Sequence, residues 1–208
     1  MAKEQQMVLI IDNYDSFVYN IIHFLALPEC EFTVVRNDRI TVETIKDMVE
    51  NKVIDCIVIS PGPMSPQAAG VSNDVIREFY KVIPIFGICL GHECIGDVFG
   101  CQITQCKEII HGESDVVYIE DSPLYAHLPD KIHAARYHSL CISEEGFNSE
   151  ELIVDARIGD GTIMGVRHRK YPLFGVQYHP ESILTGENGK TILHNFIAFS
   201  KKYAKENQ

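Results

Sequence analysis

Hydrophobic positions in the first half of the chain alternate between two patterns. Short continuous apolar runs, typical of strands buried on both faces of a parallel sheet, predict strands at residues 7–11, 31–36, 53–59 and 83–88. Between them, apolar residues recur at helical spacing and predict helices opened by Ser16 and by Thr41, then near 72–81 and from about Gly91. This alternation predicts an α/β fold with an open, doubly wound, mostly parallel sheet and helices on both faces.

The pattern changes after residue 102, where strands are expected without helices between them. Further strands are predicted at 153–158, 162–167 and 173–178, and a final helix at 188–203. Asp160-Gly161 is a strong signal for a two-residue hairpin turn, so this stretch is expected to add antiparallel strands to the edge of the main sheet. With no repeat or long linker, residues 1–208 are predicted to form a single domain with its core at about 8–199.

Charge and composition narrow the function. A formal net charge of -11 argues against a nucleic-acid partner, because such partners favour basic surfaces. No apolar stretch approaches the ~20 residues that span a bilayer, and seven cysteines without zinc or redox spacing suit a reducing cytosol. We therefore expect a soluble cytoplasmic protein without a membrane segment. His111, Cys101 and Cys106 are too irregularly spaced to predict a metal site, and no cofactor is expected in this chain.

Cys89 is the first candidate for chemistry, in the sequence Gly87-Ile88-Cys89-Leu90-Gly91. It lies where a predicted buried strand meets a helix, and glycines on both sides give room for a strained turn that exposes its central residue. The helix N-terminus behind it favours thiolate over thiol. The competing interpretation of this pentapeptide is a buried structural cysteine.

His179 and Glu181 are candidates for the base that a cysteine nucleophile needs. They follow a predicted buried strand, and Pro180 between them favours extended geometry. Residues two apart in an extended segment point to the same side, so Glu181 is expected to orient the imidazole of His179. The amides of Leu90 and Gly62 are candidate donors to an oxyanion, although an ordinary surface turn is the alternative for the Gly62 loop.

These motifs, in this order, resemble class I (triad) glutamine amidotransferases. Within that family they are similar to the amidotransferase component of anthranilate synthase and of aminodeoxychorismate (para-aminobenzoate) synthase. The resemblance covers residues from about 8 to 196. The residues that carry it are Gly87-Ile88-Cys89-Leu90-Gly91-His92, Asp12-Asn13-Tyr14-Asp15-Ser16-Phe17, Arg136-Tyr137-His138-Ser139-Leu140 and Gln177-Tyr178-His179-Pro180-Glu181-Ser182 with Thr185.

The resemblance implies that Cys89 attacks the carboxamide of L-glutamine and that His179 protonates the departing ammonia. It also implies an oxyanion hole at Gly62 and Leu90. The positions that bind glutamine in the family fall on Gly62, Pro63, Met64, Glu93, Ser139 and Leu140. The implied partner is a separate chorismate-using synthase subunit in a hetero-oligomer, and Mg²⁺ is expected in that subunit.

Three positions depart from the family pattern. Met64 replaces the glycine of the usual Pro-Gly-Pro-Gly loop, and Glu113 replaces lysine after His111-Gly112. Glu93 replaces glutamine, and an ionised carboxylate accepts hydrogen bonds but cannot donate them. Glu93 keeps two alternatives open: a non-catalytic binding subunit, or an enzyme for a different amide. The intact set of Cys89, His179 and Glu181 favours an active glutaminase.

Overall fold

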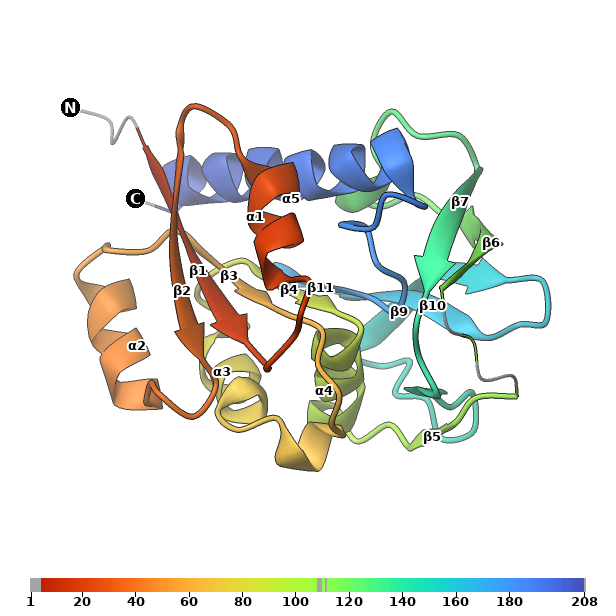
Figure 1. The fold of residues 1–208 in the computed structure, drawn as a ribbon. Coiled ribbons are helices and arrows are strands. Elements are labelled where there is room, and N and C mark those ends of the chain that lie inside the picture. The colour runs from red at the N-terminus through yellow and green to blue at the C-terminus, as the bar shows by residue number, and fades with distance from the viewer. Residues whose placement is uncertain (1–4, 108–109, 111, 208) are drawn as a thin grey trace.

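One large sheet organises the part of the chain that the computed structural model describes, residues 5–107, 110 and 112–207. Its strands run in the order β2-β1-β3-β4-β11-β10-β9-β6-β7 (Figure 1). The first five in that order are parallel, and β10, β9, β6 and β7 continue the sheet as antiparallel strands. Their bounds are β1 Gln6–Asp12, β2 Cys30–Arg36, β3 Cys56–Ile59, β4 Ile85–Ile88, β6 Glu113–Ile119, β7 Lys131–Arg136, β9 Leu152–Ile158, β10 Ile163–His168 and β11 Leu173–Val176.

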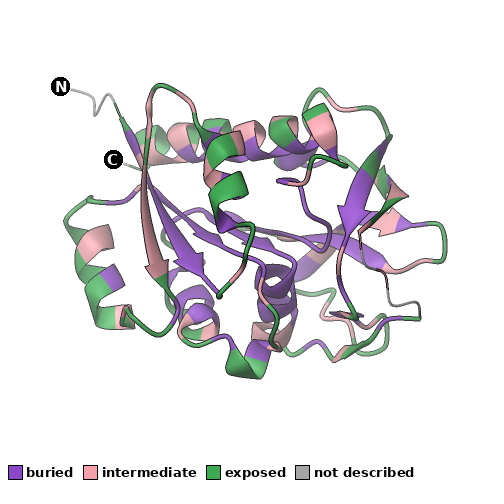
Figure 2. Cartoon of the chain, viewed as in Figure 1, coloured by how far each residue is buried: buried purple, intermediate pink, exposed green. Residues whose placement is uncertain are grey.

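Helices cover both faces of the parallel part. The helices are α1 Val18–Leu25, α2 Val42–Glu50, α3 Ser72–Phe79, α4 Leu90–Val98 and α5 Gly186–Glu206, with short 3₁₀ turns at Pro66–Ala68 (η1) and Pro123–Tyr125 (η2). Figure 1 shows α1 and α5 above the sheet and α2, α3 and α4 beneath it. Each layer seals one apolar core, and Figure 2 shows the central strands buried between them. The predicted doubly wound fold class is confirmed.

The two predicted helix starts fare differently. Thr41 caps α2 as expected, because its side-chain oxygen accepts a hydrogen bond from the Thr44 amide. The prediction for Ser16 is wrong: α1 has Phe17 at its N-cap position without a side-chain hydrogen bond. The side chain of Asp15 instead accepts from the Phe17 amide, and that of Asp12 accepts from the Asp15 amide, so the carboxylates order this turn.

The strand predicted at 53–59 is too long, because its first residues belong to the end of α2. Lys52 has a φ of 54°, its amide donates to Val49 O, and the Val53 amide donates to Met48 O. With Lys52 in the left-handed conformation, these two hydrogen bonds form a Schellman turn at the C-terminus of α2. The turn reverses the chain before β3 begins at Cys56.

The antiparallel half confirms the predicted hairpin. Strands β9 and β10 pair around Asp160-Gly161, where Gly161 adopts a φ of 90° that a side chain disfavours. One element was not predicted: β5 Ile103–Gln105 and β8 Leu140–Ile142 form a separate two-stranded antiparallel sheet. His111, which was considered for a metal site, lies outside the described residues, whereas Glu113, the departure from the family pattern, is the first residue of β6.

Candidate active site

The turn between β4 and α4 presents Cys89 in a strained backbone conformation, with φ 51° and ψ -102°. The flanking glycines allow α4 to approach the sheet closely. A Cβ atom added to Gly87 would lie 2.4 Å from Gly91 O, and one added to Gly91 would lie 2.5 Å from Ile59 O. The predicted strained turn is confirmed, and glycine is required there because backbone meets backbone.

Two further residues of the predicted site meet this turn. His179 Nδ1 lies 2.6 Å from Glu181 Oε1, and both side chains are buried. The Cys89 thiol lies close enough to influence the charge of the same imidazole, whose Nε2 has no hydrogen-bond partner among the described residues. A carboxylate, an imidazole and a thiol in this sequence of contacts have the geometry of a nucleophile activated by an oriented base.

Burial and the neighbouring charges set the protonation of this pair. Burial raises the pKa of the Cys89 thiol, and the opposing effect of His179 does not cancel it. Burial also lowers the pKa of His179, but Glu181 and Cys89 outweigh that effect and hold it well above its ordinary value. The expectation that the helix N-terminus favours thiolate over thiol is therefore wrong: burial has the larger effect on the Cys89 pKa. The raised pKa of His179 means that its neutral imidazole is a stronger base toward the Cys89 thiol than an ordinary histidine is.

The antiparallel half holds His179 in place, through contacts that the sequence did not predict. The His179 amide donates to Ala135 O at the end of β7 (3.0 Å). The Thr185 hydroxyl donates to His179 O (2.7 Å) and accepts from the Ala135 amide (2.9 Å). The ring of Tyr137 packs edge-on against the imidazole, with centroids 5.0 Å apart. Thr185 thus connects the segment with the base to a strand distant in sequence.

Asn13 positions the loop with Gly62. Its amide donates to Ser60 Oγ and its side-chain nitrogen to Ser60 O, both at 2.9 Å, where β3 ends. A Cβ atom on Gly62 would lie 2.6 Å from Asn13 O and 2.9 Å from Leu90 Cδ2, so the loop packs directly on the start of α4. Leu90 is the first residue of α4, and the first amides of a helix have no acceptor within it.

The substituted residues at this site are not strained. Met64 is not among the described residues with positive φ, so methionine in place of glycine carries no backbone penalty. Pro63 and Met64 are exposed beside Gly62. Ser139 ends the segment that joins β7 to β8 and begins with Tyr137, and Leu140 is the first residue of β8. Their contact with glutamine stays a prediction.

Glu93 is buried one helical turn after Cys89. Gln177 Nε2 donates to Glu93 Oε1 (2.9 Å) and lies 3.9 Å from Cys89 Sγ. Burial raises the pKa of Glu93 to about 7, against the hydrogen bond from Gln177. A large share of the molecules therefore carries a protonated Glu93 near neutral pH, and this form has a donor O–H like the amide it replaces. Sequence reasoning missed Gln177, although its spacing of two from His179 places both on one side.

The segment before α1 also faces the site. The Phe17 ring lies 6.1 Å from that of Tyr137, and Phe17 is 43% exposed rather than part of the core. The Asp15 carboxyl lies in the field of Glu181 and His179. Burial, reinforced by the charge of Glu181, raises the pKa of Asp15 to about 6. This segment therefore lies near the candidate site.

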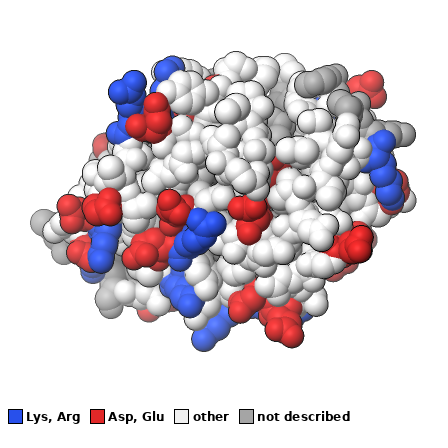
Figure 3. Space-filling model, turned by 90° about the horizontal axis from the view of Figure 1, so that it is seen from below, with Lys and Arg blue, Asp and Glu red and all other residues white. Residues whose placement is uncertain are grey.

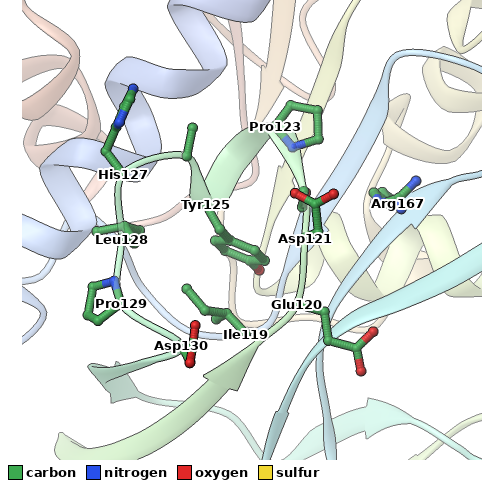
Figure 4. Close-up of a pocket in the computed structure, with 12 residues that line it drawn as sticks. Ile119, Glu120, Asp121, Pro123, Tyr125, His127, Leu128, Pro129, Asp130 and Arg167 are labelled. Carbon is green, nitrogen blue, oxygen red and sulfur yellow. The ribbon is translucent and has the colours of Figure 1, made fainter.

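Other features lie apart from this constellation. An open pocket of about 650 Å³ is lined by residues 119–123 and 125–130 and by Arg167, and Figure 4 shows Tyr125 and Asp121 among the lining side chains. It contains none of the predicted site residues. Among the described residues, no group of three or more His, Cys, Asp or Glu side chains is arranged to hold a metal ion. No helix in the described ranges is long and apolar enough to cross a membrane.

Comparison with known proteins places these features in a family context. The family model described as "Glutamine amidotransferase class-I" matches residues 9–199. The chain is 45% identical to anthranilate synthase component 2 of Cyanophora paradoxa, over 92% of this chain and 98% of that protein. It is 41% identical to aminodeoxychorismate/anthranilate synthase component 2 of Bacillus subtilis, over 94% and 98% of the two chains. The match to the Bifunctional protein TrpGD of Thermotoga maritima is 47% identical over 91% of this chain, which spans only 32% of that longer protein.

Two solved structures share the fold. A putative GMP synthase component from Thermoplasma acidophilum superposes with a TM-score of 0.82 at 22% identity, covering 98% of both chains. A glutamine amidotransferase from Thermotoga maritima superposes with a TM-score of 0.75 at 14% identity, covering 95% of this chain and 98% of the other. At these identities the superpositions support the α/β architecture alone.

Proposed function

From the premise that this chain belongs to the class-I glutamine amidotransferase family, we propose that it hydrolyses L-glutamine and delivers the ammonia to a chorismate-using synthase subunit. The observation that carries the proposal is Cys89 on a strained turn in the electrostatic field of a buried His179, whose ring Glu181 holds through a 2.6 Å contact. A structural cysteine would not need the disfavoured φ of Cys89.

In the proposed acylation, Cys89 Sγ attacks the side-chain carbonyl carbon of glutamine while its proton passes to His179 Nε2. The resulting oxyanion accepts hydrogen bonds from the amides of Gly62 and Leu90, a role that the close packing of the Gly62 loop on the Leu90 side chain supports. Collapse of the tetrahedral intermediate breaks the carbon–nitrogen bond, and His179 returns the proton to the leaving group as ammonia departs. A glutamyl thioester on Cys89 remains.

In the proposed deacylation, His179 takes a proton from water, whose oxygen attacks the thioester carbon. The carbon–sulfur bond then breaks, glutamate leaves and Cys89 regains its proton. Glu181 stabilises the imidazolium in both halves, which agrees with the raised pKa of His179. Pro63, Met64, Glu93, Ser139 and Leu140 are proposed to bind the substrate.

The surface around the triad supports a protein partner. Large hydrophobic side chains are exposed on three segments that border the site: Tyr14, Phe17 and Tyr19 before and within α1, Met64 beside Gly62, and Ile183 with Leu184 after Glu181. Clustered exposed apolar groups indicate an interaction surface. A protein docked there would cover the site from which ammonia leaves. We propose that this partner is the chorismate-using synthase and that it, rather than this chain, holds Mg²⁺.

Charge and thiol chemistry agree with this assignment. On the face shown in Figure 3, Lys and Arg side chains lie beside Asp and Glu side chains. All seven cysteines are free thiols, which suits the proposed cytoplasmic location. The relatives include components of anthranilate synthase and of aminodeoxychorismate/anthranilate synthase, so both amino acceptors remain candidates.

Glu93 motivated the alternatives of a non-catalytic or differently specific subunit. The raised pKa of Glu93 weakens both, because a protonated carboxyl group donates and accepts hydrogen bonds as the family's glutamine does. The intact contacts among Cys89, His179 and Glu181 also favour a working enzyme.

The test is glutamate release from glutamine by the purified chain with the synthase subunit from the same organism and chorismate. Wild type is expected to turn over, and Cys89→Ala to lose at least about 10⁴-fold in turnover. Cys94→Ala is the matched control, because Cys94 is a buried thiol of the same helix outside the triad. Equal turnover by wild type and Cys89→Ala, or none by wild type in a demonstrably assembled complex, would contradict the proposal.

A further inference from the structure

A buried histidine that the proposed mechanism does not use lies between β7 and β8. This residue, His138, is 3% exposed. The residue before it, Tyr137, packs its ring on the imidazole of His179, and the residue after it, Ser139, is proposed to bind glutamine. The hydrogen bonds of His138 therefore bear on how this segment is presented to the candidate site.

Arg136 fixes the protonation state of the His138 imidazole. Arg136 Nε donates to His138 Nε2 (3.1 Å), and a guanidinium group cannot accept, so Nε2 carries no proton. The proton of the neutral ring is therefore on Nδ1. Burial, together with the charges of Arg136 and His179, lowers the pKa of His138 to about 4, so the neutral form prevails near neutral pH. Asp115 Oδ2 in turn accepts from Arg136 Nη1 (2.8 Å) and holds the guanidinium in place.

The one N–H group of this neutral ring is directed at the backbone of β8. His138 Nδ1 lies 2.9 Å from Leu140 O and 3.2 Å from Cys106 Sγ. The carbonyl oxygen is the closer acceptor, and sulfur is a weak one. The hydrogen bond from His138 to the residue two positions further along the chain thus fixes the direction of the Leu140 carbonyl group.

The strand pairing shows which way that carbonyl group faces. The Cys106 amide donates to Ser139 O (2.8 Å), so these two residues form a hydrogen-bonded pair that continues the ribbon of β5 and β8. In an antiparallel ribbon the next residue directs its amide and carbonyl groups away from the partner strand. Leu140 is that residue. Its carbonyl group is held by His138, and its amide, which points the same way, takes no part in the pairing with β5.

We propose that His138 is a positioning residue for glutamine binding, because its Nδ1–H group holds the backbone of Leu140 in the orientation that receives the substrate. Arg136 and Asp115 keep the imidazole in the form that can do so. The inference rests on the proposed function, in which Ser139 and Leu140 bind glutamine.

The nucleophile and the base are held without His138. Cys89 lies on the strained turn before α4, and His179 is bonded to Glu181 and Thr185. A substitution of His138 should therefore weaken the binding of glutamine while the chemical step is nearly preserved. A general loss of folding would not separate KM from kcat in this way.

Three substitutions separate the two hydrogen bonds of the imidazole. His138→Asn puts an amide N–H at the position of Nδ1 and keeps the bond to Leu140 O, whereas His138→Gln reaches the position of Nε2 and keeps only the acceptor for Arg136. His138→Ala removes both. In the complex with the synthase subunit of the same organism and chorismate, His138→Gln and His138→Ala should raise KM for glutamine at least about tenfold, with kcat within about threefold of wild type. His138→Asn should stay within about threefold of the wild-type KM.

His168→Ala is the matched control, because it removes a second buried histidine that has hydrogen bonds of its own. His168 Nδ1 accepts from the amides of Lys170 and Tyr171, and its Nε2 lies 2.9 Å from Glu151 Oε2. It is the last residue of β10, beside the start of β11, whereas the candidate site follows the end of β11. This variant should lose stability but keep the wild-type KM.

Backbone amide exchange tests the positioning without glutamine turnover. In deuterated buffer, the peptide with residues 139–142 should exchange at least about tenfold faster in His138→Ala than in wild type, and at the wild-type rate in His168→Ala. Unchanged exchange in His138→Ala would overturn the inference. So would a wild-type KM in His138→Ala, or an equal rise of KM in His138→Asn or His168→Ala. An assembled wild-type complex that does not hydrolyse glutamine would instead overturn the proposed function, and this inference with it.

Discussion

The candidate site is assembled where two unlike halves of one sheet meet. The parallel half, β2-β1-β3-β4, presents Cys89, and the antiparallel half, β10-β9-β6-β7, braces His179. Strand β11 belongs to both, because it pairs in parallel with β4 and antiparallel with β10. Gln177, His179 and Glu181 follow directly from it.

The two halves secure their residues in different ways. Cys89 is held by backbone packing on several sides, because α4 lies so close to the sheet that Gly87 and Gly91 have no room for a Cβ atom. His179 depends on fewer contacts: its backbone bonds to Ala135 and Thr185, its pairing with Glu181 and the ring of Tyr137. We infer that removing one side chain that contacts His179 disturbs the position of the base more than removing one side chain next to Cys89 disturbs the position of the nucleophile.

The largest expected effect tests the base directly. Glu181→Gln keeps the shape of the side chain but removes the charge that raises the pKa of His179. We expect turnover of glutamine to fall about 1,000-fold or more, since loss of a triad carboxylate removes both orientation and charge stabilisation. The measurement is glutamate release by the assembled complex. Glu187→Gln, on the exposed first turn of α5, is the control and should retain activity.

The second prediction tests the packing of the parallel half. Gly87→Ala places a methyl group 2.4 Å from Gly91 O, where neither backbone segment can move independently. We expect the free energy of unfolding in urea to fall by about 3 kcal/mol. Gly159→Ala is the antiparallel counterpart, because nothing lies within 4 Å of the added atom, and it should change stability by less than about 0.5 kcal/mol. Similar losses in both variants would remove the contrast between the halves.

The same contrast explains what the sequence could predict of the fold. In the parallel half, apolar runs and helical spacing are local signals, so strands and helices were placed correctly apart from their ends. The error at 53–59 arose because Val53 completes the C-terminus of α2 through a hydrogen bond to Met48. In the antiparallel half, the Asp160-Gly161 turn is local and was found, whereas the pairing of β5 with β8 joins distant segments and left no local signal.

The candidate site likewise combines features that have a local sequence signal with features that do not. The contact of Cys89 with His179 and Glu181 was predicted, because each motif follows a buried strand and parallel strands end at one edge. The bracing by Thr185 and by the ring of Tyr137 was not predicted, because each depends on a contact between distant segments. The structure also reversed the expected protonation of Cys89, since burial cannot be measured from a pentapeptide.

A third prediction compares a buried carboxyl group in each half. Burial raises the pKa of Glu93, in the parallel half, to about 7, and that of Asp155 on β9 to about 7 as well. Between the ordinary carboxyl pKa and about 7, the folded protein keeps a proton that the unfolded chain has released. The free energy of unfolding therefore falls as pH rises through this window, and the loss is complete above it.

Glu93→Gln and Asp155→Asn should each remove about 2 kcal/mol of the fall in stability between pH 4.5 and 8. Urea unfolding across this range measures it, with exposed Glu78→Gln as a control that keeps the wild-type slope. Only Glu93→Gln should also change KM for glutamine, since Asp155 lies outside the site. A pH slope that neither substitution alters would show that these groups ionise normally.

The smallest effect is expected at the connection between the halves, and it is the most specific test of how the base is held. Thr185→Val keeps the volume of the side chain but removes the hydroxyl that joins the Ala135 amide to His179 O. The Ala135 amide and the His179 carbonyl oxygen then lose this hydrogen-bond partner, which lowers the free energy of unfolding by about 1 kcal/mol. Because His179 loses orientation rather than contact with substrate, turnover should fall about tenfold while KM for glutamine stays close to wild type. Thr191→Val removes a hydroxyl bonded only to Glu187 O within α5 and serves as the matched control. Unchanged turnover in Thr185→Val would mean that Glu181 and Tyr137 suffice to hold the imidazole, and that the base is as securely held as the nucleophile.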